Sequence, residues 1–282
     1  MKRWANMLGL SALVLLCGCG GAGYQGTTRA AGGGAGGVTS SPPSPGPNVE
    51  GNWQFSMTST ASGALPLSIG GSISPSGGSV SGAVHISGSN CFDPVSTVGL
   101  TGTLTGSDLS LTATSVDGQV TTLTGTISDN TLTATHLPGE FIGTYVINGG
   151  CAGGDKGNVT GVKISSMAGN WAGDLTSETG DTNRLVVTLA QGAATSEGIF
   201  GLTGTAFFEV GTCFKSAKIT SGKFPAGSYV MGNSVSLEIQ TDNGVIVLVG
   251  KAQGDGLIRG NYMLAGSTCE PAGTGYLSPW EY

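Results

Sequence analysis

Charged side chains are scarce in this 282-residue sequence, and their scarcity already excludes some kinds of partner. Only 10% of the residues are charged, whereas an ordinary globular domain has about 25%. The 17 acidic residues outnumber the 11 lysines and arginines, so the net charge is −6. Because the basic residues form no cluster, nothing attracts a phosphate backbone, and we exclude nucleic acid as a partner.

Strong helix formers are also under-represented. The chain contains 52 glycines, and serine and threonine supply most of its remaining polarity. All three residue types lower helix propensity. The composition therefore argues against an α-helical protein and favours the all-β class.

Catalytic and metal-binding motifs are missing as well. The sequence contains no G-x-S-x-G or H-E-x-x-H pattern and no C-x-x-C pair for zinc. His85 lies in an alternating stretch and His136 near a turn, and we expect both to be surface or hydrogen-bonded side chains. The acidic residues are scattered rather than gathered into a calcium loop. We therefore predict a protein that is not an enzyme and has no metal site and no cofactor.

The first 18 residues have the three parts of a secretory signal. Lys2 and Arg3 supply a charged end, an apolar stretch follows at residues 8–16, and small residues come next. The apolar stretch is too short to span a membrane as a stable anchor. We therefore expect residues 1–18 to be a signal peptide that is removed from the mature protein.

Residues 16–19, Leu-Cys-Gly-Cys, resemble the lipobox of bacterial lipoproteins. In that family the last cysteine of the motif receives a diacylglycerol and becomes the new N-terminus, which implies this role for Cys19. The resemblance implies a protein of the bacterial cell envelope that is held to a membrane by its N-terminal lipid. Gly20 stands where the family's inner-membrane members carry aspartate, so we expect the outer membrane rather than the inner one.

Residues 19–48 are predicted to be the lipidated cysteine followed by a flexible tether. They contain a glycine-rich run at 32–37 and a proline-rich run at 42–47, with almost no apolar side chains to bury. A coil of this length would hold a folded domain roughly 30 Å from the membrane on average. We expect the folded part of the chain to follow this tether.

The rest of the sequence contains an internal repeat. The same landmarks occur twice in the same order, with small changes in spacing, as expected after a duplication followed by loop changes. We therefore predict two tandem domains, residues 49–166 and 167–282. The landmarks are Gly-Asn-Trp at 51–53 and 169–171, Cys-Phe at 91–92 and 213–214, Leu/Val-Ser-Leu at 109–111 and 235–237, and Gly-x-Tyr at 143–145 and 260–262.

Within each copy, apolar residues alternate with serine and threonine. Leu109, Leu111 and Ala113 show the pattern, which is typical of strands with one buried face. Turn sequences such as Asp117-Gly118 separate these runs and predict tight hairpins. About eight short strands fit in each copy, which favours an antiparallel up-and-down β-barrel or, alternatively, a β-sandwich. The glycines within the strands favour the barrel, because closing a barrel requires strongly bent strands.

A Gly-x-Trp sequence at the first strand of a hairpin-connected domain resembles the lipocalin and avidin group of eight-stranded ligand-binding barrels. Gly51 with Trp53 matches this motif in the first copy, and Gly169 with Trp171 matches it in the second. The resemblance implies that Trp53 and Trp171 each plug one end of a barrel. It also implies a fold that can bind a small ligand.

Four cysteines remain after the signal and the lipidated residue are set aside. Three pairings are possible, and the duplication favours Cys91 with Cys151 and Cys213 with Cys269. An oxidising cell envelope permits both disulfides.

The leading functional hypothesis is a lipid-anchored binding module for a small apolar or amphiphilic ligand. The alternative is a structural or adhesive surface lipoprotein with solid barrels and no ligand. The second copy is richer in aromatic residues and methionine, so it is the better candidate for an apolar cavity. The sequence leaves the ligand's identity and the oligomeric state open.

Overall fold

The computed structural model describes residues 47–128, 139–210, 214, 216–253, 256–266 and 272–280. All regular elements in these ranges are β-strands, which confirms the all-β prediction. Within them there is no helix of the length and apolarity needed to cross a membrane. The predicted signal peptide, Cys19, nearly all of the tether, His136, Cys213 and Cys269 lie outside the described residues.

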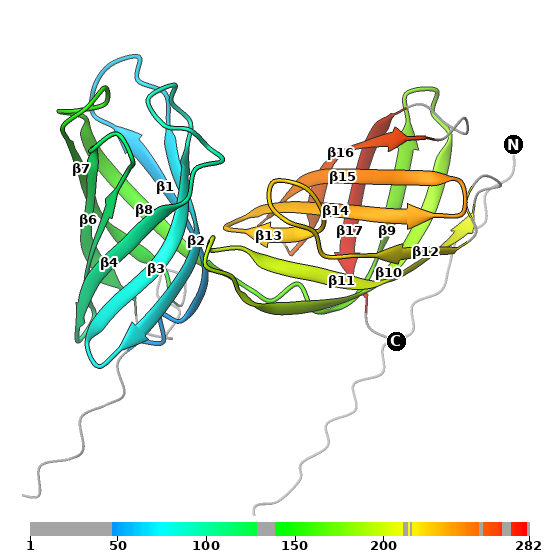
Figure 1. Ribbon diagram of the computed structural model, residues 1–282, viewed down its shortest axis with the longest axis horizontal. Helices are drawn as coiled ribbons and strands as arrows, with labels where there is room; N and C mark the ends of the chain where they lie inside the picture. Colours follow the sequence, from blue (N-terminus) through cyan, green and yellow to red (C-terminus); the bar gives the residue numbers. More distant parts are fainter. Residues whose placement is uncertain are drawn as a thin grey trace, which may run out of the picture. The chain divides into compact units, whose positions relative to one another are not determined.

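The first copy is a closed barrel of eight strands. Each strand pairs in antiparallel fashion with the next, and β8 pairs with β1 to complete the ring (Figure 1). This order confirms an up-and-down barrel rather than a sandwich. The strands are β1 (Gly51–Ser59), β2 (Leu67–Ser76), β3 (Ser79–Ser87), β4 (Val98–Thr105), β5 (Asp108–Thr114), β6 (Val120–Ile127), β7 (Phe141–Asn148) and β8 (Lys156–Ile164).

The second copy is a closed antiparallel barrel with one divided position in its ring. Two short strands, β12 and β13, each pair with both β11 and β14, and together they stand where β4 stands in the first barrel. The ring closes through β10–β11 and β9–β17. The strands are β9 (Gly169–Ser177), β10 (Thr182–Ala194), β11 (Phe200–Val210), β12 (Ser216–Ile219), β13 (Tyr229–Met231), β14 (Ser234–Thr241), β15 (Gly244–Ala252), β16 (Ile258–Ala265) and β17 (Gly273–Pro279).

The landmarks of the sequence repeat fall on equivalent strands. Gly-Asn-Trp opens β1 and β9, and Gly-x-Tyr lies in β7 and β16. The first barrel ends with β8 at Ile164 and the second begins with β9 at Gly169. The two copies therefore have separate barrels that meet at a short linker.

The alternating pattern places one face of each strand inside the barrel. In β5, Leu109, Leu111 and Ala113 are buried, while Ser110 and Thr112 between them are partly exposed. Successive side chains of a strand point to opposite faces of the sheet, so this apolar series lines the barrel interior. The outer face is left to small polar side chains over most of the first barrel.

Candidate functional site

The interior of each barrel is filled with packed side chains. In the first barrel Trp53 stacks on Phe55 with ring centroids 5.6 Å apart, and Phe55 meets Phe141 edge-on at the same distance. In the second barrel the buried cluster includes Leu202, Leu237 and many other aliphatic side chains. Both barrels thus bury a continuous apolar core.

The aromatic residues of the second copy are only partly inside its barrel. Phe200 and Phe214 belong to the core, whereas Phe207 is 44% exposed and Met263 is 58% exposed. Phe224 reaches His85 of the first barrel, with ring centroids 4.7 Å apart. Much of the aromatic surplus of the second copy therefore lies on its outside and against the first barrel.

The two equivalent tryptophans make the same kind of hydrogen bond at the start of their barrels. Trp53 is 1% exposed and its indole Nε1 donates a hydrogen bond to the Val49 carbonyl at 2.7 Å. Trp171 is 6% exposed and its Nε1 donates to the Met167 carbonyl at 2.9 Å. A buried indole N–H needs such a partner. The barrel-plug assignment predicts that each tryptophan stabilises its own domain.

One predicted disulfide is present. Cys91 and Cys151 are bonded, with their Cα atoms 5.5 Å apart. Beside them the buried Gln119 side chain joins both cysteine loops, because its Nε2 donates to the Cys91 carbonyl and its Oε1 accepts from the Ala152 N–H, each at 2.8 Å. The second predicted pair, Cys213 and Cys269, lies outside the described residues and stays a prediction.

Several polar side chains on the outer face of the first barrel are buried by the second copy. Asn52 is 3% exposed, its Nδ2 donates to the Gly232 carbonyl at 2.9 Å, and its Oδ1 accepts from the Gly232 N–H at 2.7 Å. Gln54 Oε1 accepts from the Asn233 N–H at 3.1 Å. These reciprocal bonds hold the β13–β14 turn against β1.

His85, one of the two histidines, belongs to the same contact. It is 2% exposed on the outer face of β3. Its Nε2 lies 2.9 Å from the Glu197 carbonyl of the second barrel, and its Nδ1 lies 3.3 Å from the Pro94 carbonyl of its own barrel. His85 is therefore a hydrogen-bonded interface residue, in agreement with the expectation of a structural role.

Two glycines of the second copy allow this close approach. Gly232 has a φ of +53°, and a Cβ there would lie 2.8 Å from the Gly70 Cα. Gly198 has a φ of +76°, and a Cβ there would lie 1.9 Å from the Ala83 carbonyl oxygen. Both conformation and space exclude a side chain at these positions. The contact between the barrels depends on backbone meeting backbone.

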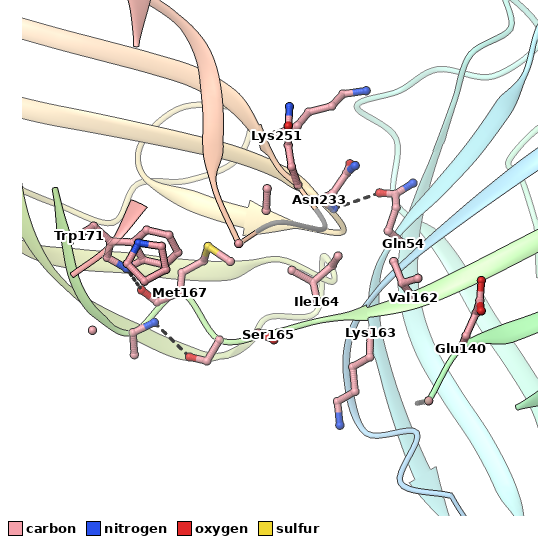
Figure 2. A pocket seen from close by; sticks show the side chains of 18 of the residues that line it. Gln54, Glu140, Val162, Lys163, Ile164, Ser165, Met167, Trp171, Asn233 and Lys251 are labelled. Atoms are coloured by element: carbon pink, nitrogen blue, oxygen red, sulfur yellow. Dashed lines mark hydrogen bonds between the residues drawn. The ribbon is translucent and has the colours of Figure 1, made fainter. Parts of the chain in front are cut away.

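A cleft with a volume of about 860 Å³ opens beside this contact (Figure 2). Strands of both barrels and the linker between them contribute to it. Because its walls come from both copies, the cleft exists only in the tandem protein. Its apolar and aromatic lining includes Val162, Ile164, Met167, Trp171, Pro279 and Trp280, and its polar lining includes Gln54, Glu140, Lys163, Asn233, Lys251 and Gln253.

Polar side chains line the cleft beside its apolar ones. Figure 2 shows Asn233 and Lys251 near Gln54, with the Asn233–Gln54 hydrogen bond between the two copies. In the same view Lys163 points away from Lys251, on the opposite side of β8. Among the described residues, Glu140 is the acidic one that lines this cleft. The arrangement offers hydrogen bonds and positive charge next to an apolar surface.

Titratable groups elsewhere form small networks within single barrels. Tyr145 donates to Asp155 Oδ2 at 2.9 Å, and Ser59 donates to Asp155 Oδ1 at 2.5 Å. Burial and the Asp155 hydrogen bond raise the pKa of Tyr145 to about 12. On the second barrel Arg184 lies 3.4 Å from Asp174 in a half-exposed pair.

In the part of the chain that the structure describes, no three histidine, cysteine, aspartate or glutamate side chains come close enough together to hold a metal ion. The predictions of no metal and no cofactor stay predictions.

The cleft residues were missed by sequence reasoning. Asn233 and Lys251 follow the ordinary pattern of a turn and an outward-facing strand position, and nothing in the sequence distinguishes them. The Gly-Asn pair at 232–233 signals the tight turn between β13 and β14. It does not signal that the turn contacts another domain.

The fold defines a class of protein: two closed antiparallel up-and-down β-barrels in tandem, with a cleft between them. No protein-family model matches the sequence, and no curated protein matches it either. One similar solved structure is the crystal structure of kievitone hydratase from Nectria haematococca. It has 10% sequence identity and a TM-score of 0.24, and the alignment covers 83% of this chain and 90% of that chain. At this TM-score the likeness supports no conclusion about function.

Proposed function

We propose that this chain is a lipid-anchored protein of the bacterial cell envelope that binds a small amphiphilic ligand in the cleft between its two barrels. The observation that carries the proposal is the cleft of about 860 Å³, with apolar side chains and several polar groups in its walls. Pockets for small molecules usually have volumes of about 300 to 1,000 Å³ and occur preferentially where domains meet.

The filled barrel interiors support the cleft rather than a barrel lumen as the ligand site. The side chains that a lipocalin-like barrel would keep apart around a ligand are packed together in both copies, as with Trp53, Phe55 and Phe141. A ligand in a barrel would have to displace this core. The cleft needs no such rearrangement.

The anchor at Cys19 is the second part of the proposal. An acylated N-terminus and a long tether would keep the barrels at the membrane, where amphiphilic molecules are concentrated. We expect Cys19→Ser to move the protein from the membrane fraction to the soluble fraction and to abolish labelling with radioactive palmitate. If the serine variant still sediments with membranes and takes up label, Cys19 is not the lipid attachment site.

Ligand binding can be tested in the Cys19→Ser chain by native mass spectrometry. We expect a non-covalent adduct in this parent and its loss in Ala168→Trp, because Ala168 lines the cleft and an indole there would occupy it. Ala61→Trp is the matched control, since Ala61 is exposed in a loop of the first barrel. An adduct that persists in Ala168→Trp would place the ligand elsewhere.

The alternative function is a structural or adhesive surface lipoprotein without a ligand. The filled barrel cores favour it, since solid barrels suit a purely structural spacer. This alternative predicts no adduct in the parent and no binding of amphiphilic probes. The same mass-spectrometry experiment therefore separates the two functions.

A further inference from the structure

We propose that Lys251 and Asn233 form a subsite for the anionic head group of the ligand, so that the cleft selects amphiphiles with a carboxylate or phosphate head over neutral ones. This inference rests on the proposed function and names the chemical class of its ligand.

The two residues lie at neighbouring positions of the paired strands β14 and β15. Lys251 lies in β15 opposite Ser234, the first residue of β14, and Asn233 directly precedes that residue. The Ala252 N–H donates to the Asn233 carbonyl at 2.8 Å, which ties the turn to the end of β15. On its other side, the Asn233 N–H is bound by Gln54. The Asn233 backbone is therefore fixed from both barrels.

The functional groups of both side chains are available. In the ranges that the structure describes, neither the Lys251 ammonium nor the Asn233 side-chain amide has a hydrogen bond or an ion pair. The ammonium has three N–H donors and no acceptor, and the amide contributes two more donors. A carboxylate or phosphate oxygen is the complementary partner, because charge-assisted hydrogen bonds are stronger than neutral ones.

The charges of the cleft lining favour an anionic head group. Among the described residues that line the cleft, Lys163 and Lys251 outnumber Glu140, whereas the whole chain has a net charge of −6. The described part of the lining thus carries a positive charge on an acidic protein. A head group with one or two negative charges benefits from Lys251 without strong repulsion from the rest of the molecule.

The apolar part of the ligand has a surface to cover. Of the apolar residues that line the cleft, Val162 and Pro279 are exposed and Ile164 is half-buried, whereas Met167 and Trp171 are buried behind them. Burying an alkyl chain against the exposed ones gives a favourable free energy that does not depend on the head group. The head-group subsite should therefore determine selectivity, and the apolar wall should provide affinity to all chains of equal length.

The test compares decanoate with 1-decanol, which have the same chain length and differ at the head. Calorimetric titration of the Cys19→Ser chain should show decanoate bound about tenfold more tightly, as expected from one charge-assisted hydrogen bond. Lys251→Gln should abolish this preference, because it should weaken the binding of decanoate and leave the binding of decanol unchanged. Decyl phosphate, titrated in parallel, distinguishes a phosphate head, as in a phospholipid, from a carboxylate head, as in a fatty acid.

A lysine variant outside the cleft serves as the control. Lys223→Gln removes a positive charge from an exposed loop of the second barrel. It should retain the preference for decanoate. Unchanged thermal transitions in Lys251→Gln would show that the variant is folded.

The possible failures are distinguishable. If the parent binds decanoate and decanol equally, or if Lys223→Gln reduces the preference as much as Lys251→Gln does, the head-group assignment is wrong while ligand binding stands. If neither decanoate, decyl phosphate nor decanol binds the parent, the proposed function fails and the head-group subsite fails with it.

Discussion

In the first barrel one continuous strand, β4, bridges β3 and β5, whereas in the second the short strands β12 and β13 share the equivalent position. The segment between β12 and β13 supplies Phe224, which contacts His85. The β10–β11 hairpin supplies the Glu197 carbonyl and the β13–β14 turn supplies Gly232. The second copy therefore contributes loops to the contact, and the first contributes the outer face of its strands.

The same residue has two roles in the two copies. Asn52 in β1 is buried against Gly232, whereas Asn170, at the equivalent place in β9, is half-buried and accepts a hydrogen bond from Thr188 of its own barrel at 2.9 Å. The duplication preserved the residue, and only its surroundings changed. Divergence after duplication thus made an asymmetric interface from two similar domains.

The largest expected effect is the loss of a buried tryptophan. Trp53→Ala and Trp171→Ala should each destabilise their own barrel by about 3 to 5 kcal/mol through lost burial and a residual cavity. Trp53→Ala should have the larger effect, because Trp53 also stacks on Phe55 whereas the second barrel has Gly173 at that place. Calorimetry of each variant measures the shift of each barrel's transition.

The outcome also tests how independent the barrels are. If both variants melt like the parent, the tryptophans do not plug the barrels. If Trp53→Ala lowers both transitions equally, the barrels unfold as one unit and the contact through Asn52 and His85 is stronger than its few hydrogen bonds suggest.

The next largest effect should come from the disulfide of the first barrel. Replacing Cys91 and Cys151 together by serine should cost about 2 to 4 kcal/mol in this barrel alone, because the bond closes a loop with a sequence separation of 60 residues. Peptide mapping without reduction should recover this link and also the predicted link between Cys213 and Cys269. A bridge from one copy to the other would contradict the pairing inferred from the duplication.

Alternating runs such as Leu109, Leu111 and Ala113 predicted the strands and the barrel, because a closed antiparallel sheet has one buried face that the sequence must supply. The repeat predicted the Cys91–Cys151 bond, because duplicated cysteines pair most simply within a copy. The division of one ring position between β12 and β13 was not foreseen, since such short strands carry too little alternation to be recognised.

The interface and the cleft were not predictable from the sequence. Asn52 and Asn170 occupy identical Gly-Asn-Trp motifs, and only the tertiary structure buries the first between the barrels. Lys251 occupies an ordinary exposed strand position. Contacts between domains depend on how whole surfaces meet, and a local pattern in one strand carries no information about that.

A smaller effect should follow from breaking the contact between the barrels. Asn52→Ala removes the partner of both the N–H and the carbonyl of Gly232, at a cost of about 1 to 3 kcal/mol if the barrels stay in contact. Hydrogen exchange should show the Gly232 amide protected in the parent and exchanging faster in the variant. Asn170→Ala is the matched control and should leave Gly232 protected. Equal exchange in all three proteins would mean that this contact does not persist in solution.

The smallest expected effect concerns the alkaline stability of the first barrel. Burial and the hydrogen bond to Asp155 raise the pKa of Tyr145 to about 12, so the folded barrel holds this proton more tightly than the unfolded chain, in which the pKa is about 10. The resulting stability is fully present below pH 10 and is lost as the pH rises toward 12, by up to about 2 kcal/mol. Tyr145→Phe should lose the hydrogen bond at neutral pH but flatten this decline for the first barrel only. The second barrel is the internal reference, because Tyr276 and Tyr229 also have raised pKa values and keep its alkaline dependence in both proteins. Thermal melts between pH 8 and pH 11 would measure both transitions together, and an equal alkaline decline of the first barrel in parent and variant would show that Tyr145 does not govern it.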